Sequence, residues 1–346
     1  MTGGSRAGRV AMLRRRAVAP FVVLAVALGT AACGKDSPSM FDTKGPESHS
    51  IHNVAWLMFG LAGAVYVIVA GFIVVAVLRG RRRRDDEAPS KPEPKDDTFI
   101  WFGGIVVPVV ILALLAVVTV RTTEHLRRVS SSELRIQVTG KRWWWDVRYP
   151  DSGVVTANEI HIPVGRPIDF ILLSDNVIHS FWVPQLGGKV DTIPGQTNHL
   201  RMQASEPGTY RGECAEYCGI QHANMNYLVI AEAPADFDRW MARRTSGAGL
   251  APTSDQTARG QVVFSREACA GCHTIRGTQA SGTIGPDLSE FGNRQTIGAL
   301  TVPNTPDNLR KWITDPDGVK PGNLMPPTAL SPEDLAAVVA YLEGLK

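Results

Sequence analysis

Two apolar segments in the first third of the chain are each long enough to cross a lipid bilayer. Residues 55–78 run for 24 residues, and residues 99–120 for 22 residues, without a charged side chain. A membrane-spanning helix needs about 20 apolar residues, and a buried helix of a soluble protein is rarely so long. Pro108 interrupts the second segment, but membrane helices tolerate proline where neighbours satisfy the freed carbonyl. We therefore predict a transmembrane helical hairpin over residues 50–122.

The loop between the two segments predicts the orientation of this hairpin. Short cytoplasmic loops are enriched in lysine and arginine. The basic residues of this loop are Arg79, Arg81, Arg82, Arg83, Arg84, Lys91 and Lys95. We expect the loop to be cytoplasmic, so that everything after Arg121 lies outside the plasma membrane of a bacterial cell.

Residues 1–32 are typical of an export signal. A basic stretch at Arg14–Arg16 precedes an apolar stretch from Ala17 to Gly29, and Thr30–Ala32 provides small residues before a cleavage site. Cys33 follows directly, in an arrangement that resembles a bacterial lipoprotein processing site. Lipidation of Cys33 would tether the chain to the membrane. Ordinary cleavage and an uncleaved anchor are the alternatives, and neither gives this cysteine a role.

The charge balance gives no reason to expect a nucleic-acid partner. The formal net charge is +3, and five arginines in the first 32 residues account for more than all of it. The remaining chain is close to neutral and lacks the basic excess that attracts polyanions. Hydrophobic residues make up 44% of the sequence, which excludes a disordered chain.

The region after the hairpin divides into two predicted domains joined by a linker. Residues 133–244 contain short strand-like runs separated by turn residues, which favours an all-β sandwich or barrel. The runs are 134–138, 143–149, 161–165, 168–173 and 227–231. Residues 245–254 are small and polar, as in a flexible linker. Residues 255–346 form a separate module, whose last helix is predicted from Ser331 to Leu345 because Ser-Pro-Glu-Asp is a typical helix start.

Cys269-Ala270-Gly271-Cys272-His273 matches the attachment pattern of a c-type haem. Two thiols reach the two vinyl groups of one porphyrin, and the next residue offers an imidazole to the iron. Redox disulfides and zinc sites also use C-x-x-C, but the histidine and the predicted export favour haem. Met325 lies 52 residues later, among prolines rather than on an apolar helical stripe. We predict it as the second axial ligand, which suits electron transfer, rather than as a core methionine.

Over its whole length, this C-terminal module resembles a small class I cytochrome c. The resemblance implies an all-α domain with one haem c, bound covalently through Cys269 and Cys272 and axially through His273 and Met325. It also implies that the carbonyl of Pro286 accepts a hydrogen bond from His273 and fixes the tautomer of that ring.

A second cluster of metal-binding side chains lies within twelve residues, from Cys214 to Met225. Two thiols, the imidazole of His222 and a thioether are the soft ligands that select copper. Cys214 and Cys218 can bridge two copper ions, each of which takes one histidine. A disulfide and a zinc site are the alternatives, but both leave Met225 unused. Spacing alone does not choose the second histidine among His161, His179 and His199.

Three motifs resemble cytochrome c oxidase subunit II, and the likeness runs from the hairpin to about Arg244. They are HSFWVP at 179–184, GKVDTIPG at 188–195 and GTYRGEC at 208–214. The resemblance implies a cupredoxin-like β-barrel that holds the binuclear copper A centre. The implied ligands are His179 and His222, the bridging thiolates of Cys214 and Cys218, the weak axial Met225, and the backbone carbonyl of Glu216.

The same resemblance assigns two further roles and shows one departure. It implies that the carboxylate of Glu216 reaches a magnesium or manganese ion at the subunit I boundary. It also implies that electrons enter at Trp143, although packing of a core is the plainer role for a tryptophan triplet. The family usually has a glutamate at a proton-channel mouth where this chain has Thr98. Asp96 or Asp97 are the candidates to replace it.

Together these features predict subunit II of a cytochrome c oxidase with a fused cytochrome c domain. Electrons would pass from a cytochrome bc complex or a cytochrome c through haem c and copper A to subunit I, which reduces dioxygen to water with proton translocation. Subunit III is a further expected partner. The alternative is the electron-entry subunit of a copper-A-type nitric oxide reductase. Such a subunit would look similar, because the reaction is determined by the catalytic partner subunit. Quinol oxidase subunits lack the copper ligands, and a copper-delivery or thiol-redox protein would explain neither the hairpin nor the haem.

Overall fold

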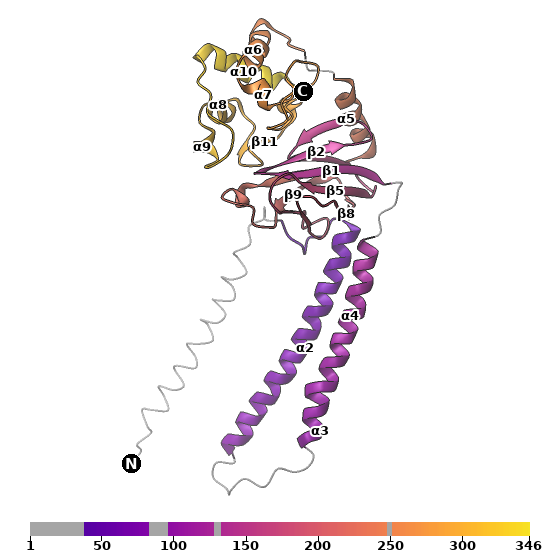
Figure 1. Ribbon diagram of the computed structural model, residues 1–346. Coiled ribbons are helices and arrows are strands. Elements are labelled where there is room, and N and C mark those ends of the chain that lie inside the picture. The colour runs from indigo at the N-terminus through magenta and orange to yellow at the C-terminus, as the bar shows by residue number, and fades with distance from the viewer. Residues whose placement is uncertain (1–37, 83–95, 128–132, 248–250) are drawn as a thin grey trace, which may run out of the picture. The chain divides into compact units, whose positions relative to one another are not determined.

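The computed structural model describes residues 38–82, 96–127, 133–247 and 251–346 (Figure 1). The predicted export signal and Cys33 lie outside these residues.

The hairpin is formed by two long helical segments that lie side by side (Figure 1). The first is α2 (Pro46–Arg82), and the second runs through α3 (Asp96–Trp101), the π-helical turn η2 (Phe102–Val106) and α4 (Val107–Leu126). Both are long and apolar enough to cross a membrane, and their apolar side chains are exposed along most of their length. The π turn ends two residues before Pro108, a residue that has no N–H to donate.

The first turn of α2 is anchored in the part of the chain that follows the hairpin. Glu47 is 3% exposed, forms an ion pair with Arg201 and accepts a hydrogen bond from the backbone N–H of Gln203 at 3.1 Å. The hydroxyl of Ser48 donates to the carbonyl of Gln185 at 2.8 Å. The helix is therefore continuous from its apolar segment to its buried N-terminal turn.

The next part, called here the β domain, is a sandwich of two five-stranded sheets with the orders β3-β2-β1-β5-β8 and β4-β10-β9-β6-β7. The strands of the first sheet are β1 (Leu134–Lys141), β2 (Trp144–Tyr149), β3 (Val154–Ala157), β5 (Ile168–Ser174) and β8 (Asn198–Met202). The strands of the second are β4 (Glu159–Pro163), β6 (His179–Trp182), β7 (Val190–Thr192), β9 (Gly208–Cys214) and β10 (Asn226–Glu232). The predicted all-β fold is confirmed.

Side chains that point alternately toward and away from the space between the two sheets build the core. Ile136 and Val138 of β1 are fully buried, whereas the side chains between and beside them are more exposed. Helix α5 (Pro234–Ser246) closes one end of the β domain by burying Phe237 and Trp240. The ring of His161 stacks on Trp240 with 4.3 Å between ring centroids.

The remaining part, called here the C-terminal domain, is mainly helical. Its elements are α6 (Asp255–Arg266), α7 (Cys269–Cys272), η4 (Phe291–Asn293), β11 (Thr296–Ile297), β12 (Val302–Pro303), α8 (Pro306–Thr314), α9 (Pro316–Val319) and α10 (Pro332–Gly344). Ser254 caps α6 and Ser331 caps α10, each by accepting a backbone hydrogen bond. The small β11–β12 hairpin is an addition to the helices expected from the sequence, because two-residue strands leave no periodic pattern.

Candidate functional site

The strands of the second sheet bring the predicted copper ligands to one end of the β domain. His179 begins β6, Cys214 ends β9, and Met225 directly precedes β10. The backbone N–H of Cys214 donates to the carbonyl of Met225 at 3.1 Å, which closes the intervening loop. Pairing of Phe181 with Cys214 places β6 beside β9. A histidine 35 residues away along the chain thus reaches the cysteines through strand pairing.

The sulfur and nitrogen atoms of these side chains form a continuous cluster. The Sγ atoms of Cys214 and Cys218 are 3.8 Å apart. The Nδ1 atom of His179 lies 3.9 Å from Cys214 Sγ, and that of His222 lies 3.7 Å from Cys218 Sγ. The Sδ atom of Met225 lies 3.8 Å from Cys218 Sγ. His179, not His161 or His199, is therefore the second histidine that the structure brings to the thiols.

Burial and chemistry of the donors fit a copper site. His179 and Met225 are fully buried, Cys214 is 6% exposed and Cys218 is 5% exposed. Donor atoms of His179, Cys214 and Cys218 all lie within 4.8 Å of one another, as ligands of shared metal ions must. Thiolate, imidazole and thioether together suit copper better than a hard cation.

Two local hydrogen-bond patterns prepare the donors for metal binding. The Nε2 atom of His179 lies 3.1 Å from Asn176 Oδ1, so this nitrogen carries the proton and Nδ1 presents its lone pair to the thiols. The contact between the two thiols lowers the pKa of Cys214 and raises that of Cys218, so the first proton is lost from Cys214. A thiolate is the form of cysteine that binds metal.

Glu216 and Trp143 both lie beside the cluster. The backbone oxygen of Glu216 is 3.3 Å from Cys214 Sγ, while the residue itself is exposed. The indole Nε1 of Trp143 donates to the carbonyl of Cys218 at 3.0 Å. Trp145 is fully buried in the core between the sheets, whereas Trp143 is only half-buried. Within the tryptophan triplet, Trp145 therefore packs in the core, whereas Trp143 lies against the loop that carries the copper ligands.

The C-x-x-C-H motif occupies a short helix and the residue after it. Cys269 and Cys272 lie in α7 and are not joined in a disulfide, and His273 follows in extended conformation. The Nδ1 atom of His273 lies 2.8 Å from the carbonyl oxygen of Pro286, which is the bond expected from the resemblance to class I cytochromes. Burial lowers the pKa of His273, which favours the neutral imidazole that binds iron. A Cβ atom at Gly285 would lie 2.5 Å from His273 Cε1, so a side chain there would displace the ring.

The surroundings of His273 fit an axial haem ligand. Its Nδ1–H is held by a carbonyl, so Nε2 is the nitrogen left for iron. Met325 lies in the loop between α9 and α10, where its backbone N–H donates to Asn323 Oδ1 at 2.8 Å. Met325 is half-buried.

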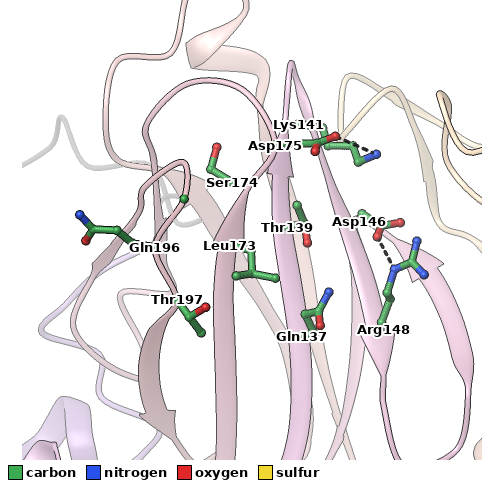
Figure 2. A pocket seen from close by; sticks show the side chains of 11 residues that line it. Gln137, Thr139, Lys141, Asp146, Arg148, Leu173, Ser174, Asp175, Gln196 and Thr197 are labelled. Atoms are coloured by element: carbon green, nitrogen blue, oxygen red, sulfur yellow. Dashed lines mark hydrogen bonds and ion pairs between the residues drawn. The ribbon is translucent and has the colours of Figure 1, made fainter.

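A shallow polar cavity of about 530 Å³ lies elsewhere on the β domain (Figure 2). Its charged side chains pair with one another: Lys141 with Asp175 at 3.2 Å, and Arg148 with Asp146 at 2.8 Å. None of the predicted ligands lines it, so the cavity is separate from the copper cluster.

Three residues that the sequence did not single out lie between the β domain and the C-terminal domain. Lys320, Gln221 and Glu159 are 3%, 5% and 4% exposed and make polar contacts across this boundary. The sequence carries no signal for them, because polar residues beside prolines and turns are usually solvent-exposed.

Comparison with known proteins identifies the family. A family model described as "Cytochrome C oxidase subunit II, periplasmic domain" matches residues 152–232, and one described as "Cytochrome c" matches residues 257–346. The chain is 35% identical over 325 residues to "Cytochrome c oxidase subunit 2" of Alkalihalophilus pseudofirmus, covering 92% of this chain and 93% of that protein. The chain belongs to the cytochrome c oxidase subunit 2 family.

Other similar proteins bear related names. "Cytochrome c oxidase subunit 2" of Bacillus sp. (strain PS3) is 32% identical over 260 residues, which cover 70% of this chain and 72% of that protein. This chain also matches the crystal structure of the periplasmic domain of subunit II of the Bradyrhizobium japonicum cytochrome oxidase, with 30% sequence identity over the matched residues. The match covers 34% of this chain and 98% of the chain in that structure, with a TM-score of 0.33.

Family membership fixes the broad function. The chain is a membrane-anchored, electron-transport subunit of an oxidoreductase complex, with subunit I as its partner. Its subunit 2 domain implies copper A, and its cytochrome c domain implies haem. The alternative of a nitric oxide reductase subunit is not favoured, because the relatives are named cytochrome c oxidases.

Proposed function

We propose that this subunit passes electrons from an external donor to haem c, then to copper A, and then to the catalytic subunit I. The observation that carries the proposal is the cluster of two thiols, two imidazoles and one thioether at one end of the β domain. It is supported by a second, separate donor set around His273 in the same chain.

The proposed copper ligands are His179, His222, Cys214, Cys218, Met225 and the carbonyl of Glu216. Copper A supplies a site that accepts and releases one electron at a time. The chain holds His179 and Cys214 on paired strands and buries most of the donors, which limits rearrangement when the charge of the site changes and excludes water. The exposed carboxylate of Glu216 is proposed to reach a magnesium or manganese ion shared with subunit I.

The proposed haem attachment is through Cys269 and Cys272, with His273 and Met325 as axial ligands. The Pro286 carbonyl orients the imidazole. The thioether of Met325 would close the iron to other ligands, which suits electron transfer.

The topology and the remaining partners belong to the same proposal. The basic residues between α2 and α3 support a cytoplasmic loop, with the two metal-binding domains outside the cell membrane. The donor is a cytochrome bc complex or a cytochrome c, and subunit III completes the assembly. Residues 133–244 and 255–346 are the proposed functional domains, with residues 245–254 as their linker, and Cys33 is a proposed lipidation site.

The proposal is tested by spectroscopy of the intact oxidase complex carrying Cys218→Ser. We expect loss of the near-infrared copper band and of electron transfer from haem c to subunit I, while the haem c spectrum stays intact. Met225→Leu is expected to shift the copper band, and Met202→Leu, at another fully buried methionine of the β domain, serves as its control. An unchanged near-infrared band in Cys218→Ser would refute the binuclear site.

A further inference from the structure

The side chain of Lys320 joins the C-terminal domain to the β domain. Its Nζ atom donates to the carbonyl of Trp143 at 3.1 Å, to that of Asn224 at 2.8 Å and to that of Gly298 at 2.8 Å. Gly298 belongs to the C-terminal domain, whereas Trp143 and Asn224 belong to the β domain. The amine of Lys320 is thus bound by carbonyl oxygens from three segments that are distant in sequence.

The three acceptors match the chemistry of a lysine. An ammonium group has three N–H donors and no acceptor, so three carbonyl oxygens satisfy it fully. Lys320 is only 3% exposed, and burial lowers its pKa to about 7. A buried cation without partners is costly, and removal of its side chain takes the donor away from three carbonyls. The arrangement is therefore specific for a long side chain with a terminal amine.

The β-domain acceptors lie in the two segments that border the copper cluster. Asn224 directly precedes the proposed ligand Met225. The indole of Trp143, whose carbonyl binds Lys320, donates to the carbonyl of Cys218 at 3.0 Å. Lys320 therefore binds backbone carbonyls of the segments that surround the copper ligands, and none of its three acceptors belongs to a proposed ligand.

Further polar contacts accompany Lys320 across the same boundary. Gln221 donates through Nε2 to the carbonyl of Pro321. The carboxylate of Glu159 accepts from the backbone N–H groups of Gln295 at 2.8 Å and Thr296 at 3.2 Å. Because each of these side chains is nearly buried, the two domains meet at a surface with matched donors and acceptors.

We propose that Lys320 is a positioning residue that fixes the C-terminal domain on the β domain at Trp143 and Asn224, and thereby sets the separation between haem and copper. This inference rests on the proposed function, because it concerns the electron step between the two groups. The rate of electron tunnelling falls steeply with distance. A linker alone raises the local concentration of the donor domain, but it leaves the distance between the groups variable.

The test compares Lys320→Met with Lys311→Met in the complete oxidase complex. Lys311 is an exposed lysine of α8 in the same domain, so its variant controls for loss of a positive charge. Haem and copper absorption bands first establish that both sites are intact. Lys320→Gln, which keeps a polar but shorter side chain, is the second variant if Lys320→Met loses either band.

The first readout is hydrogen exchange at Gln295 and Thr296. Their amides donate to Glu159 across the boundary and do not touch Lys320. We expect faster exchange of these amides in Lys320→Met and no change in Lys311→Met. The amide of Cys214, bonded within the β domain, and that of Gly292, bonded within the C-terminal domain, should stay protected in both variants.

The second readout is the rate at which photoreduced haem c passes its electron to copper A. We expect this rate to fall roughly tenfold or more in Lys320→Met, since small misplacements of reacting groups are costly, while the step from copper A to subunit I is unchanged. Equal rates in Lys320→Met and Lys311→Met would overturn the positioning role, whether or not the amides exchange faster. Absence of haem-to-copper transfer in the unmodified complex would instead refute the proposed function, and the exchange experiment would still decide whether Lys320 holds the domains together.

Discussion

At the scale of single residues, the ring of His179 is oriented by a neighbour three positions earlier in the chain. Asn176 lies 3.1 Å from its Nε2 atom, so the opposite nitrogen faces Cys214. Asn176 is exposed and binds no metal in our proposal. Its effect on the copper site is exerted through the histidine.

Asn176→Ala is expected to weaken copper binding by about ten- to a hundredfold, since loss of a hydrogen bond to a ligating histidine typically has this effect. Competition with a copper chelator in the intact complex measures the change. Asn198→Ala is the control, because it removes an asparagine–backbone hydrogen bond elsewhere in the β domain. Equal copper affinities in the two variants would show that Asn176 does not orient the ligand.

How far the sequence predicts such residues depends on how local their contacts are. Cys214, Cys218 and Met225 were recognisable because one loop carries them all. His179 could not be chosen by spacing, because strand pairing brings it to the loop. Lys320 gave no signal at all, since its role comes from three carbonyls whose residues are remote in sequence.

At the scale of secondary-structure elements, the C-terminal domain depends on the close approach of α6 and α10. A Cβ atom at Gly260 of α6 would lie 2.1 Å from the carbonyl oxygen of Ala337 in α10. The two helices pack with their backbones almost in contact at this point. Any larger residue at position 260 must push them apart.

Gly260→Ala should therefore destabilise the domain by about 1–3 kcal/mol, as overpacking typically does. Denaturant unfolding of the full-length protein, followed by the haem absorption band, measures this change. Gly344→Ala in α10 is the matched control, because its added Cβ would lie 3.9 Å from the nearest atom, in ordinary contact. A midpoint for Gly260→Ala equal to that of Gly344→Ala would contradict the close packing.

Element boundaries were predictable where the sequence itself marks them. Ser331 was expected to begin the last helix, and it is the N-cap of α10. The first membrane helix was expected as an apolar segment from Ala55, yet α2 begins at Pro46. Hydrophobic pattern could not reveal this extension, because the early turn is stabilised by contacts of Glu47 and Ser48 with the β domain.

At the scale of the whole molecule, the chain carries two donor sets, and in our proposal electrons pass from one to the other in order. The proposed haem ligands and the proposed copper ligands lie in different domains, so we expect that either group can be removed without loss of the other. Each step of the proposed relay is then separately accessible to experiment.

Removal of copper from the intact complex by a chelator should leave haem c reducible by its donor but stop its reoxidation by dioxygen. Stopped-flow absorption at the haem band follows both steps, and addition of copper should restore the second. Reoxidation at an undiminished rate after copper removal would mean that electrons bypass the β domain.

The buried start of α2 also has a mechanical consequence. Its 37 residues span about 55 Å, whereas the hydrocarbon core of a bilayer is about 30 Å thick. The helix thus extends well beyond the lipid and is clamped by Glu47 and Ser48 at its far end. Because the β domain is bound to the end of this helix, we expect a change in the tilt of α2 to move the β domain with it. Membrane thickness, through that tilt, is then expected to influence the height and angle of the β domain above the lipid.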